Sequence, residues 1–328
     1  MINEIKKLKK IELHLHLDGS ISLNVASKLS NLSIQKCKEE MIADLVCHDL
    51  SDYLTKFKLP ISLMQTKENL KLIASDLVNR LEKENVVYAE IRFAPMFHTS
   101  GDLTMEEVIE AVLEGLKENK KVKTNLILCL MRGINKEDNL KTIEVASKYL
   151  NKGVCALDLA GDEKKFKLSE YKDLFLLAKS KNIPFTIHAG EVDAEDISIA
   201  LELGVKRLGH GVKCIDNKKL IKEIKNKNIL LEVCPTSNIQ TKAFKNYQSH
   251  PIYKLYKENI NVSINTDNMT VSNIDLNQEY LNLINYLKFT IDDLKKINLN
   301  TINYTFLSNK EKIELLKILK EKNNKIKN

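Results

Sequence analysis

The chain has 328 residues, of which 43% are hydrophobic and 29% are charged. This composition is typical of a globular protein with a sizeable core, and no apolar run reaches the roughly 20 residues that a membrane-spanning helix needs. The formal net charge of +7 comes from lysines that are spread along helical stretches and mixed with Glu, which favours a solvated surface over a nucleic-acid-binding stripe.

The N-terminal segment and the cysteines indicate the cellular setting. Residues 1–10 are charged and lead directly into a strand-like run, without the apolar region of a signal peptide, so we expect a cytoplasmic protein with no membrane partner. The six cysteines form no C-x-x-C pair or regular framework and are expected to be free thiols. Nothing in the sequence indicates the oligomeric state.

Short β-branched or apolar runs recur along the chain, separated by longer stretches with helical periodicity. Alternating strands and helices imply a parallel sheet, and eight such units close naturally into a barrel with catalytic residues at the carboxyl ends of its strands. We therefore predict an α/β fold, a TIM-type (β/α)8 barrel, as a single domain over residues 1–328. The predicted strands are Lys10–His16, Val86–Phe93, Thr124–Met131, Val154–Leu159, Phe185–Ala189, Arg207–His210, Ile229–Cys234 and Asn261–Asn265.

Two segments depart from a plain barrel. The stretch Ser20–Arg80, between the first two strands, is far longer than a usual βα connection. It predicts a helical insertion whose apolar cluster, within Tyr53–Pro60, lies close to the barrel mouth as a cap, as a hydrophobic wall over a ligand, or as both. The segment Leu276–Asn328 predicts extra C-terminal helices that fray into a Lys/Asn-rich end. Elsewhere in the chain, Thr104 with Glu107 predicts a capping box at the start of a helix.

Metal-ligand residue types recur at the ends of the predicted strands. His14 and His16 stand two residues apart in the first strand, so their side chains point to the same face and can bind one ion together. His188 ends the fifth strand, and Asp267 follows the eighth. A third histidine and one aspartate complete a site of the kind that zinc accepts, with room for a reactive water. The sequence thus indicates metal-assisted hydrolysis.

Other polar residues accompany these candidate ligands. Glu191 follows His188 across a glycine; in a closed pocket it would hold a proton as a general acid, and the alternative is a helix N-terminal acid that interacts with the helix dipole. His210, between two glycines, is either a fourth metal ligand or a base beside the metal. Asn268 can both donate and accept hydrogen bonds, and Gly161 exposes a backbone N–H at a strand end. No role is assigned to His48, His98 and His250.

Taken in order, these residues resemble the adenosine deaminase family of metal-dependent barrel hydrolases. The stretch 53–60, followed by 63–66, is similar to the family's lid segment. H-x-H alone occurs across many metallohydrolases, but the ordered combination is highly specific and covers nearly the whole chain. The matching elements are HLHLDGS at 14–20, LDLAGDE at 157–163, HAGE at 188–191, GHG at 209–211, CPTSN at 234–238 and NTDN at 265–268.

The resemblance implies one zinc ion per chain, held by His14, His16, His188 and Asp267. Zinc lowers the pKa of its bound water toward about 7. The family pattern further implies three catalytic residues: His210 takes or stabilises the proton of that water, Asp267 aims the hydroxide at C6 of the purine, and Glu191 protonates N1.

The resemblance also implies a purine nucleoside as the small-molecule partner. His16 would contribute to substrate binding, Gly161 would donate its N–H to N3, Asp18 would contact the ribose 5′-hydroxyl, and Phe57 and Leu59 would line the pocket. The implied reaction converts adenosine and 2′-deoxyadenosine to inosine and 2′-deoxyinosine plus ammonia, in purine salvage. Nucleic-acid deaminases fit less well, because this chain lacks their P-C-x-x-C spacing.

One position departs from the family pattern. Many members carry a second aspartate after the metal-binding one, whereas this chain has Asn268. An asparagine donates to N7 without having to be protonated, so we expect purine recognition to persist. The alternatives are a deaminase of adenine or another aminopurine, and a non-catalytic nucleoside-binding protein on the same scaffold. AMP is disfavoured because Asp18 would repel its phosphate.

Overall fold

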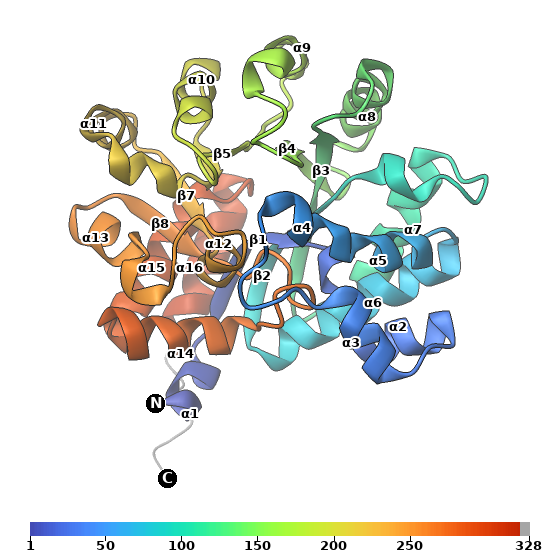
Figure 1. Cartoon of the computed structure of the whole chain (residues 1–328), viewed down its shortest axis with the longest axis horizontal. Helices are drawn as coiled ribbons and strands as arrows, with labels where there is room; N and C mark the ends of the chain where they lie inside the picture. The colour runs from blue at the N-terminus through green and yellow to red at the C-terminus, as the bar shows by residue number, and fades with distance from the viewer. Residues whose placement is uncertain (322–328) are drawn as a thin grey trace.

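The computed structural model describes residues 1–321 and contains eight parallel strands. Hydrogen bonds pair them into two four-stranded sheets, β1 to β4 and β5 to β8. Isolated bridges join Leu157 to Phe185 and Leu15 to Asp267 at the two seams, which closes the strands into a ring (Figure 1). The strands are β1 (Lys10–His16), β2 (Val86–Phe93), β3 (Lys123–Met131), β4 (Val154–Ala160), β5 (His188–Ala189), β6 (Arg207–His210), β7 (Leu230–Val233) and β8 (Asn261–Ile264).

All eight predicted strands are confirmed, but β5 is shorter than the predicted Phe185–Ala189. The backbone at this seam is still extended and paired, since Leu157 N donates to Pro184 O at 2.9 Å and Thr186 N donates to Leu157 O at 3.0 Å. The ladder is interrupted before His188 because the Asp158 carboxylate takes the next two backbone donors: His188 N donates to Asp158 Oδ1 at 3.2 Å, and Leu159 N donates to the same oxygen at 2.7 Å.

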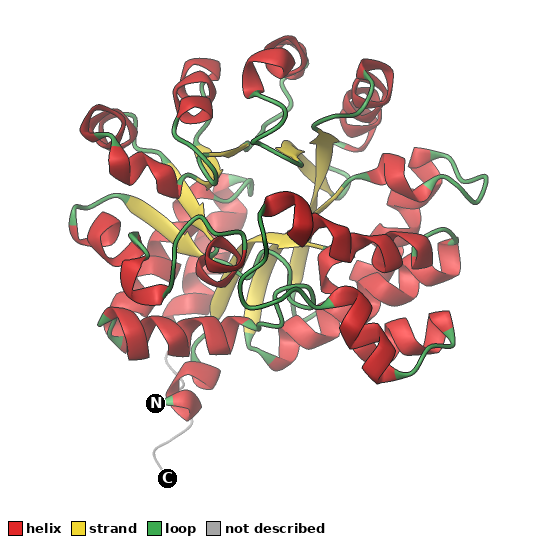
Figure 2. Cartoon of the chain, viewed as in Figure 1, coloured by secondary structure: helices red, strands yellow, loops and turns green. Residues whose placement is uncertain are grey.

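Helices surround the strands on the outside of the ring (Figure 2). Alternate residues of β3 point into this outer layer: Leu126, Leu128 and Leu130 belong to one buried cluster with the helix residues Val112 and Ile143. The helices are α1 (Ile2–Lys7), α2 (Leu23–Ser30), α3 (Ile34–Met41), α4 (Leu50–Leu54), α5 (Lys58–Leu63), α6 (Lys67–Lys83), α7 (Met105–Lys117), α8 (Lys136–Tyr149), α9 (Lys172–Ser180), α10 (Glu195–Leu203), α11 (Lys218–Asn226), α12 (Pro235–Gln240), α13 (Ile252–Lys257), α14 (Leu276–Leu287), α15 (Ile291–Thr301) and α16 (Asn309–Lys320).

The predicted helical insertion after the first strand comprises α2 to α5, while α6 is already the barrel helix between β1 and β2. The predicted capping box at Thr104 is confirmed: its side chain accepts from Glu107 N, and the Glu107 carboxylate accepts from Thr104 N. The extra C-terminal helices are α14 to α16. The Lys/Asn-rich end that the sequence predicts to fray lies largely beyond residue 321, outside the described residues.

Charged side chains occupy the interior of the barrel. Arg92 on β2 donates to Asp158 on β4 at 2.8 Å and to Glu232 on β7 at 2.7 Å, and all three are fully buried. Because β2 and β7 are not neighbours in the ring, this network lies inside it. All six cysteines are buried and free. Within residues 1–321, no helix has both the length and the apolar composition needed to cross a membrane.

Candidate active site

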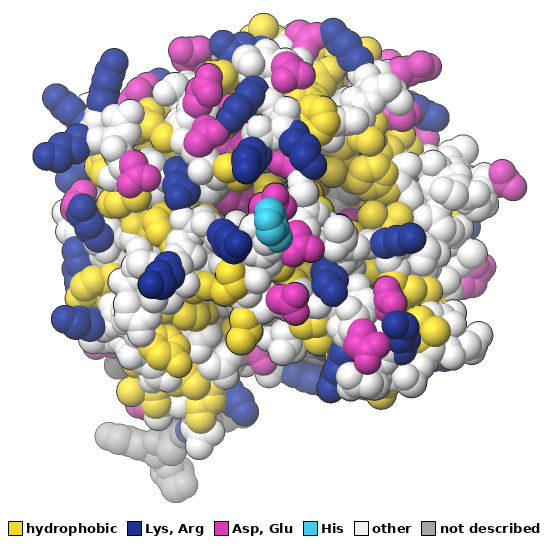
Figure 3. Space-filling view, in the orientation of Figure 1, with side chains coloured by type: hydrophobic (Ala, Val, Ile, Leu, Met, Phe, Trp, Pro, Cys, Tyr) yellow, Lys and Arg dark blue, Asp and Glu magenta, His cyan; other side chains and the backbone are white. Residues whose placement is uncertain are grey.

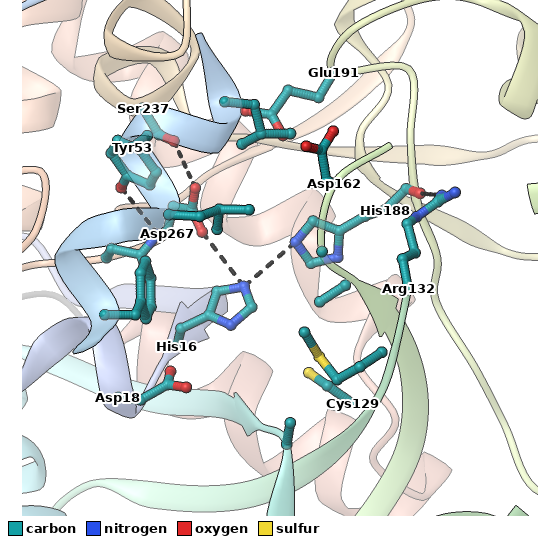
Figure 4. Close-up of a pocket in the computed structure, with 18 of the residues that line it drawn as sticks. His16, Asp18, Tyr53, Cys129, Arg132, Asp162, His188, Glu191, Ser237 and Asp267 are labelled. Atoms are coloured by element: carbon teal, nitrogen blue, oxygen red, sulfur yellow. Dashed lines mark hydrogen bonds and ion pairs between the residues drawn. The ribbon is translucent and has the colours of Figure 1, made fainter. Parts of the chain in front are cut away.

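The carboxyl ends of β1, β5, β6 and β8 bring four buried metal-ligand side chains together. Ligand atoms of His14, His188, His210 and Asp267 all lie within 4.8 Å of one another. His16 joins them: its Nε2 is 3.3 Å from His188 Nε2 and 3.5 Å from Asp267 Oδ1. Figure 4 shows His16, His188 and Asp267 pointing toward one another. The compact group therefore contains three of the predicted metal ligands together with His210, and the fourth predicted ligand, His16, lies next to His188 and Asp267.

The donor set fits a metal ion. His14 Nε2 is completely buried and has no hydrogen-bond partner; Asp267 Oδ1 lies 3.4 Å away without hydrogen-bond geometry. Leaving such an atom unpaired costs free energy unless something else binds it. Imidazole nitrogen and carboxylate oxygen are the donors that zinc accepts. This unpaired nitrogen therefore supports a cation site at the end of the barrel.

The backbone is held in unusual conformations at two of these residues. His210 and Asp267 both have φ of 62°, a left-handed value that residues other than glycine rarely adopt. Asp267 is fixed against β1, because its N donates to His14 O at 2.9 Å and its O accepts from His16 N at 2.7 Å. These bonds place the aspartate carboxylate between the two histidines of the first strand.

Carboxylates behind two of the histidines set their orientation. Glu232 Oε2 lies 2.9 Å from His14 Nδ1, and Asp158 Oδ2 lies 2.8 Å from His188 Nδ1. Glu232 favours a proton on Nδ1 of His14 and leaves its Nε2 lone pair free toward the centre of the site, and Asp158, at ion-pair distance, favours the same arrangement at His188. Arg92 contacts both carboxylates and holds them in place.

Glu191 has the protonation expected of a general acid. Burial, and then the nearby charges of Asp267 and Glu163, raise the pKa of Glu191 to about 8. Thr241 Oγ1 donates to its Oε1 at 2.9 Å, and His210 Nε2 lies 3.5 Å from its Oε2. Glu191 therefore holds a proton at neutral pH.

Asp267 is ionised in the same surroundings. Burial opposes the ionisation of its carboxyl group, but His14 and the other nearby histidines outweigh burial and hold the pKa of Asp267 well below its usual range. Ser237 Oγ donates to Asp267 Oδ2 at 2.6 Å. The site thus keeps one protonated and one ionised carboxyl group, the arrangement that acid-assisted hydrolysis requires.

A cavity of about 290 Å³ opens above these residues. Figure 3 shows a hollow on this face, and Lys and Arg side chains interspersed with Asp and Glu around it. The insertion supplies part of the wall through Tyr53 and Phe57, so its apolar cluster does cover the cavity. The predicted site residues that line it are His16, Asp18, Phe57, Gly161, His188, Glu191, His210, Asp267 and Asn268.

Leu59 does not line the cavity, contrary to the expectation from the family pattern. Its side chain packs against the main hydrophobic core, and Ile61 faces the cavity instead. Both residues lie in α5, whose helical turn carries positions two apart to different faces. Asp18 is at the cavity as predicted; burial, and then the charge of Asp267, raise the pKa of Asp18 to about 6.

Asn268 is held by the insertion. Its Nδ2 donates to the hydroxyl of Tyr53 at 3.0 Å, and that hydroxyl is 2.7 Å from Ser272 Oγ. The glycine of the HLHLDGS motif is required here, because a Cβ on Gly19 would lie 1.9 Å from Asn268 Oδ1. Asn268 therefore sits in a position that β1 and the insertion define together.

Four further residues of the site have no role that follows from the sequence alone: Arg92, Asp158, Glu232 and Ser237. The first three did leave a sign in the sequence, since each is a charged residue inside an apolar strand, and buried charges must be paired. Which charges pair with one another depends on how the ring closes. Ser237 belongs to the CPTSN motif, and only the fold shows that it contacts Asp267.

The family model described as adenosine deaminase matches residues 9–322 of the chain. The chain belongs to the adenosine deaminase family. Among adenosine deaminases, it is 41% identical to that of Clostridium botulinum (strain 657) over 330 residues, which covers 96% of this chain and 99% of the relative. The adenosine deaminase of Clostridium perfringens (strain SM101) is 40% identical over 323 residues, covering 94% and 97%.

A solved structure of similar fold agrees with this membership. The apo structure of the N6-methyl-AMP deaminase from Arabidopsis thaliana superposes with a TM-score of 0.86 at 26% identity, covering 97% of this chain and 98% of that one. The adenosine deaminase family assignment and this likeness over almost the whole chain confirm the predicted barrel. The protein is therefore an enzyme of the adenosine deaminase family.

Proposed function

We propose that the chain is a zinc-dependent adenosine deaminase that converts adenosine and 2′-deoxyadenosine to inosine and 2′-deoxyinosine with release of ammonia, in purine salvage. The observation that carries the proposal is the buried, unpaired Nε2 of His14 among other ligand atoms, next to a glutamate that is protonated at neutral pH. The relatives at about 40% identity are named adenosine deaminases, which supports the same activity here.

His14, His16, His188 and Asp267 would hold the zinc ion. When bound, zinc would lower the pKa of water and make hydroxide available near neutral pH. The carboxylates of Glu232 and Asp158 would keep His14 and His188 turned toward the ion.

Two carboxyl groups of the protein, those of Asp267 and Glu191, then have different roles in the reaction. Asp267 is ionised and anchored by Ser237, so it can accept a hydrogen bond from the attacking oxygen and aim it at C6 of the purine. Attack at C6 pushes negative charge toward N1, and the proton held by Glu191 neutralises it. Loss of the amino group as ammonia leaves the 6-oxo purine.

Other residues at the cavity would recognise the nucleoside. Gly161 would donate its N–H to N3, and Asn268, held by Tyr53, would donate to N7. Asp18 would accept from the ribose 5′-hydroxyl. Figure 4 shows Asp18 at the pocket, and a carboxylate near the 5′ position disfavours a 5′-phosphate.

The test is ammonia release and ultraviolet spectral change on mixing zinc-loaded protein with adenosine, 2′-deoxyadenosine, adenine and AMP in parallel. We expect rapid conversion of both nucleosides, abolished by a chelator and restored by zinc. Turnover of adenine alone would support the same deamination chemistry and show that the substrate is the free base. No turnover of any of the four by protein with zinc bound would overturn the proposal.

A further inference from the structure

His210 differs from His14 and His188 in the group that lies next to its Nδ1. His14 and His188 have carboxylates next to Nδ1, at 2.9 and 2.8 Å. His210 Nδ1 instead faces the side-chain amide of Asn238 on α12, with Asn238 Nδ2 at 3.0 Å. A carboxylate can only accept a hydrogen bond, whereas an amide can donate one. The proton of His210 can therefore sit on a different nitrogen from those of His14 and His188.

A second buried histidine decides which way the amide of Asn238 is turned. His250 lies between the 3-10 helix η6 (Tyr247–Ser249) and α13, and its Nε2 is 3.3 Å from Asn238 Oδ1. On its other side, His250 Nδ1 accepts from the backbone N–H of Ile252 at 3.3 Å. A backbone N–H is always a donor, so Nδ1 of His250 carries no proton.

The rest of the chain of bonds follows from that fixed donor. A neutral His250 without a proton on Nδ1 carries it on Nε2 and donates to Asn238 Oδ1. The amide nitrogen of Asn238 then faces His210 Nδ1 and donates to it. His210 Nδ1 is thus an acceptor, and neutral His210 carries its proton on Nε2, which lies 3.5 Å from Glu191 Oε2.

Two other arrangements conflict with the surroundings. If the amide of Asn238 were turned over, His250 would need its proton on Nδ1, directly against the N–H of Ile252. A doubly protonated His250 would meet the same clash, and burial lowers the pKa of His250 to about 3. Both alternatives place two donors face to face in a buried region.

We infer that Asn238 and His250 are positioning residues that keep the proton of neutral His210 on Nε2, so that His210 meets the attacking oxygen as a hydrogen-bond donor rather than as a metal ligand. This inference rests on the proposed function for the identity of the attacking oxygen, but the position of the proton does not depend on turnover. It gives a role to His250, for which the sequence alone indicates none.

The direct test is ¹⁵N NMR of the histidine rings in ¹⁵N-histidine-labelled protein loaded with zinc and without substrate. The chain has seven histidines, and the spectrum of His210→Gln identifies the His210 signals by difference. We expect a protonated Nε2 and an unprotonated Nδ1 for His210. A proton on Nδ1 of His210, or zinc coordination of its Nε2, would overturn the inference whether or not the protein deaminates adenosine.

Variants of the two positioning residues supply a second readout. Asn238→Asp places a carboxylate behind His210 and should move its proton to Nδ1. Because the Asn238 side chain also hydrogen-bonds to Glu191, turnover should fall for either reason, and the deciding readouts are the His210 ring spectrum and zinc affinity. We expect a proton on His210 Nδ1 and zinc bound at least as tightly as in the wild type. A purely structural role would weaken zinc binding and turnover together, and that result would contradict the inference.

His250→Phe keeps a ring of similar size beside Phe244, whose centroid is 5.1 Å from that of His250, and removes the donor to Asn238. We expect a mixture of His210 tautomers and a smaller loss of turnover. His250→Gln, which can still donate, should restore both. The matched control is His98→Phe: His98 is also fully buried, lies 5.7 Å from the ring of Phe93, and should leave the His210 signals unchanged. An unaltered His210 spectrum in both His250→Phe and Asn238→Asp would refute the inference.

Discussion

The guanidinium of Arg92, on β2, donates to the carboxylate of Glu232, on β7, at 2.7 Å across the interior of the barrel. The same carboxylate oxygen lies 2.9 Å from His14 Nδ1. One buried charge pair therefore connects the wall of the barrel to a candidate metal ligand.

Glu232→Gln should weaken both the metal site and the fold. Arg92 and Arg207 would lose the buried carboxylate that both contact, and breaking a buried pair in this way costs about 3–5 kcal/mol of unfolding free energy. Zinc affinity should fall about 10- to 100-fold, as measured by competition with a chelating dye. Glu202→Gln, at an exposed pair with Lys172, is the control and should leave zinc affinity as in the wild type.

His14→Ala and Asp267→Ala should each abolish zinc binding and deamination. Each change removes one donor from a compact set in which the ligand atoms lie within 4.8 Å of one another. Metal content after dialysis and ammonia release measure the two effects. Full activity in either variant would remove that residue from the site.

Glu191→Gln should retain zinc while turnover falls about 10²- to 10⁴-fold, because the amide cannot transfer a proton to N1. Since the protonated form is the active one and burial raises the pKa of Glu191 well above that of an ordinary glutamate, wild-type turnover should decline at alkaline pH. A pH profile of kcat tests this, and a turnover in Glu191→Gln close to the wild-type value would show that another group is the acid.

The same raised pKa predicts how stability depends on pH. The carboxyl of Glu191 is protonated up to about pH 8 in the folded protein, against 4.5 for an ordinary glutamate. The unfolded chain therefore loses this proton first, and the Glu191 contribution to the unfolding free energy of metal-free protein falls as the pH rises from about 4.5 to 8. Chemical denaturation across this range should show a weaker decline for Glu191→Gln.

Phe57→Ala should weaken substrate binding, whereas Leu59→Ala should lower stability. Phe57 lines the cavity, so its loss should raise KM for adenosine about three- to tenfold by removing apolar contact with the nucleoside. Leu59 packs against the core, so its loss should lower the melting temperature and leave KM close to the wild-type value. Steady-state kinetics and thermal unfolding of the pair separate the two roles, and an unchanged KM in Phe57→Ala would argue against a contact with substrate.

Asn268→Asp tests how N7 is recognised. An asparagine donates to N7 at every pH, whereas an aspartate donates only when protonated. We expect the preference for adenosine over 7-deazaadenosine to be independent of pH in the wild type and to weaken with rising pH in the variant. Equal turnover of the two nucleosides by the wild type would remove Asn268 from the recognition of N7.

The local sequence pattern was enough to predict the strands and to indicate a metal site. Runs such as Val86–Phe93 can be recognised because a buried parallel strand is apolar on both faces, and the spacing of His14 and His16 places both on one face whatever the rest of the chain does. The resemblance to a family then added roles, which the geometry around Glu191 and Asp267 supports.

Only the tertiary structure decided which distant groups meet. Arg92 and Glu232 are 140 residues apart, and His250 is separated from His210 by an entire βα unit, so no local spacing relates them. The position of Leu59 away from the cavity depends on how α5 packs, and the proton of His210 depends on a backbone N–H at Ile252. Secondary structure and ligand type follow from neighbours in the sequence, whereas charge pairing and proton position follow from contacts that exist only once the barrel has closed.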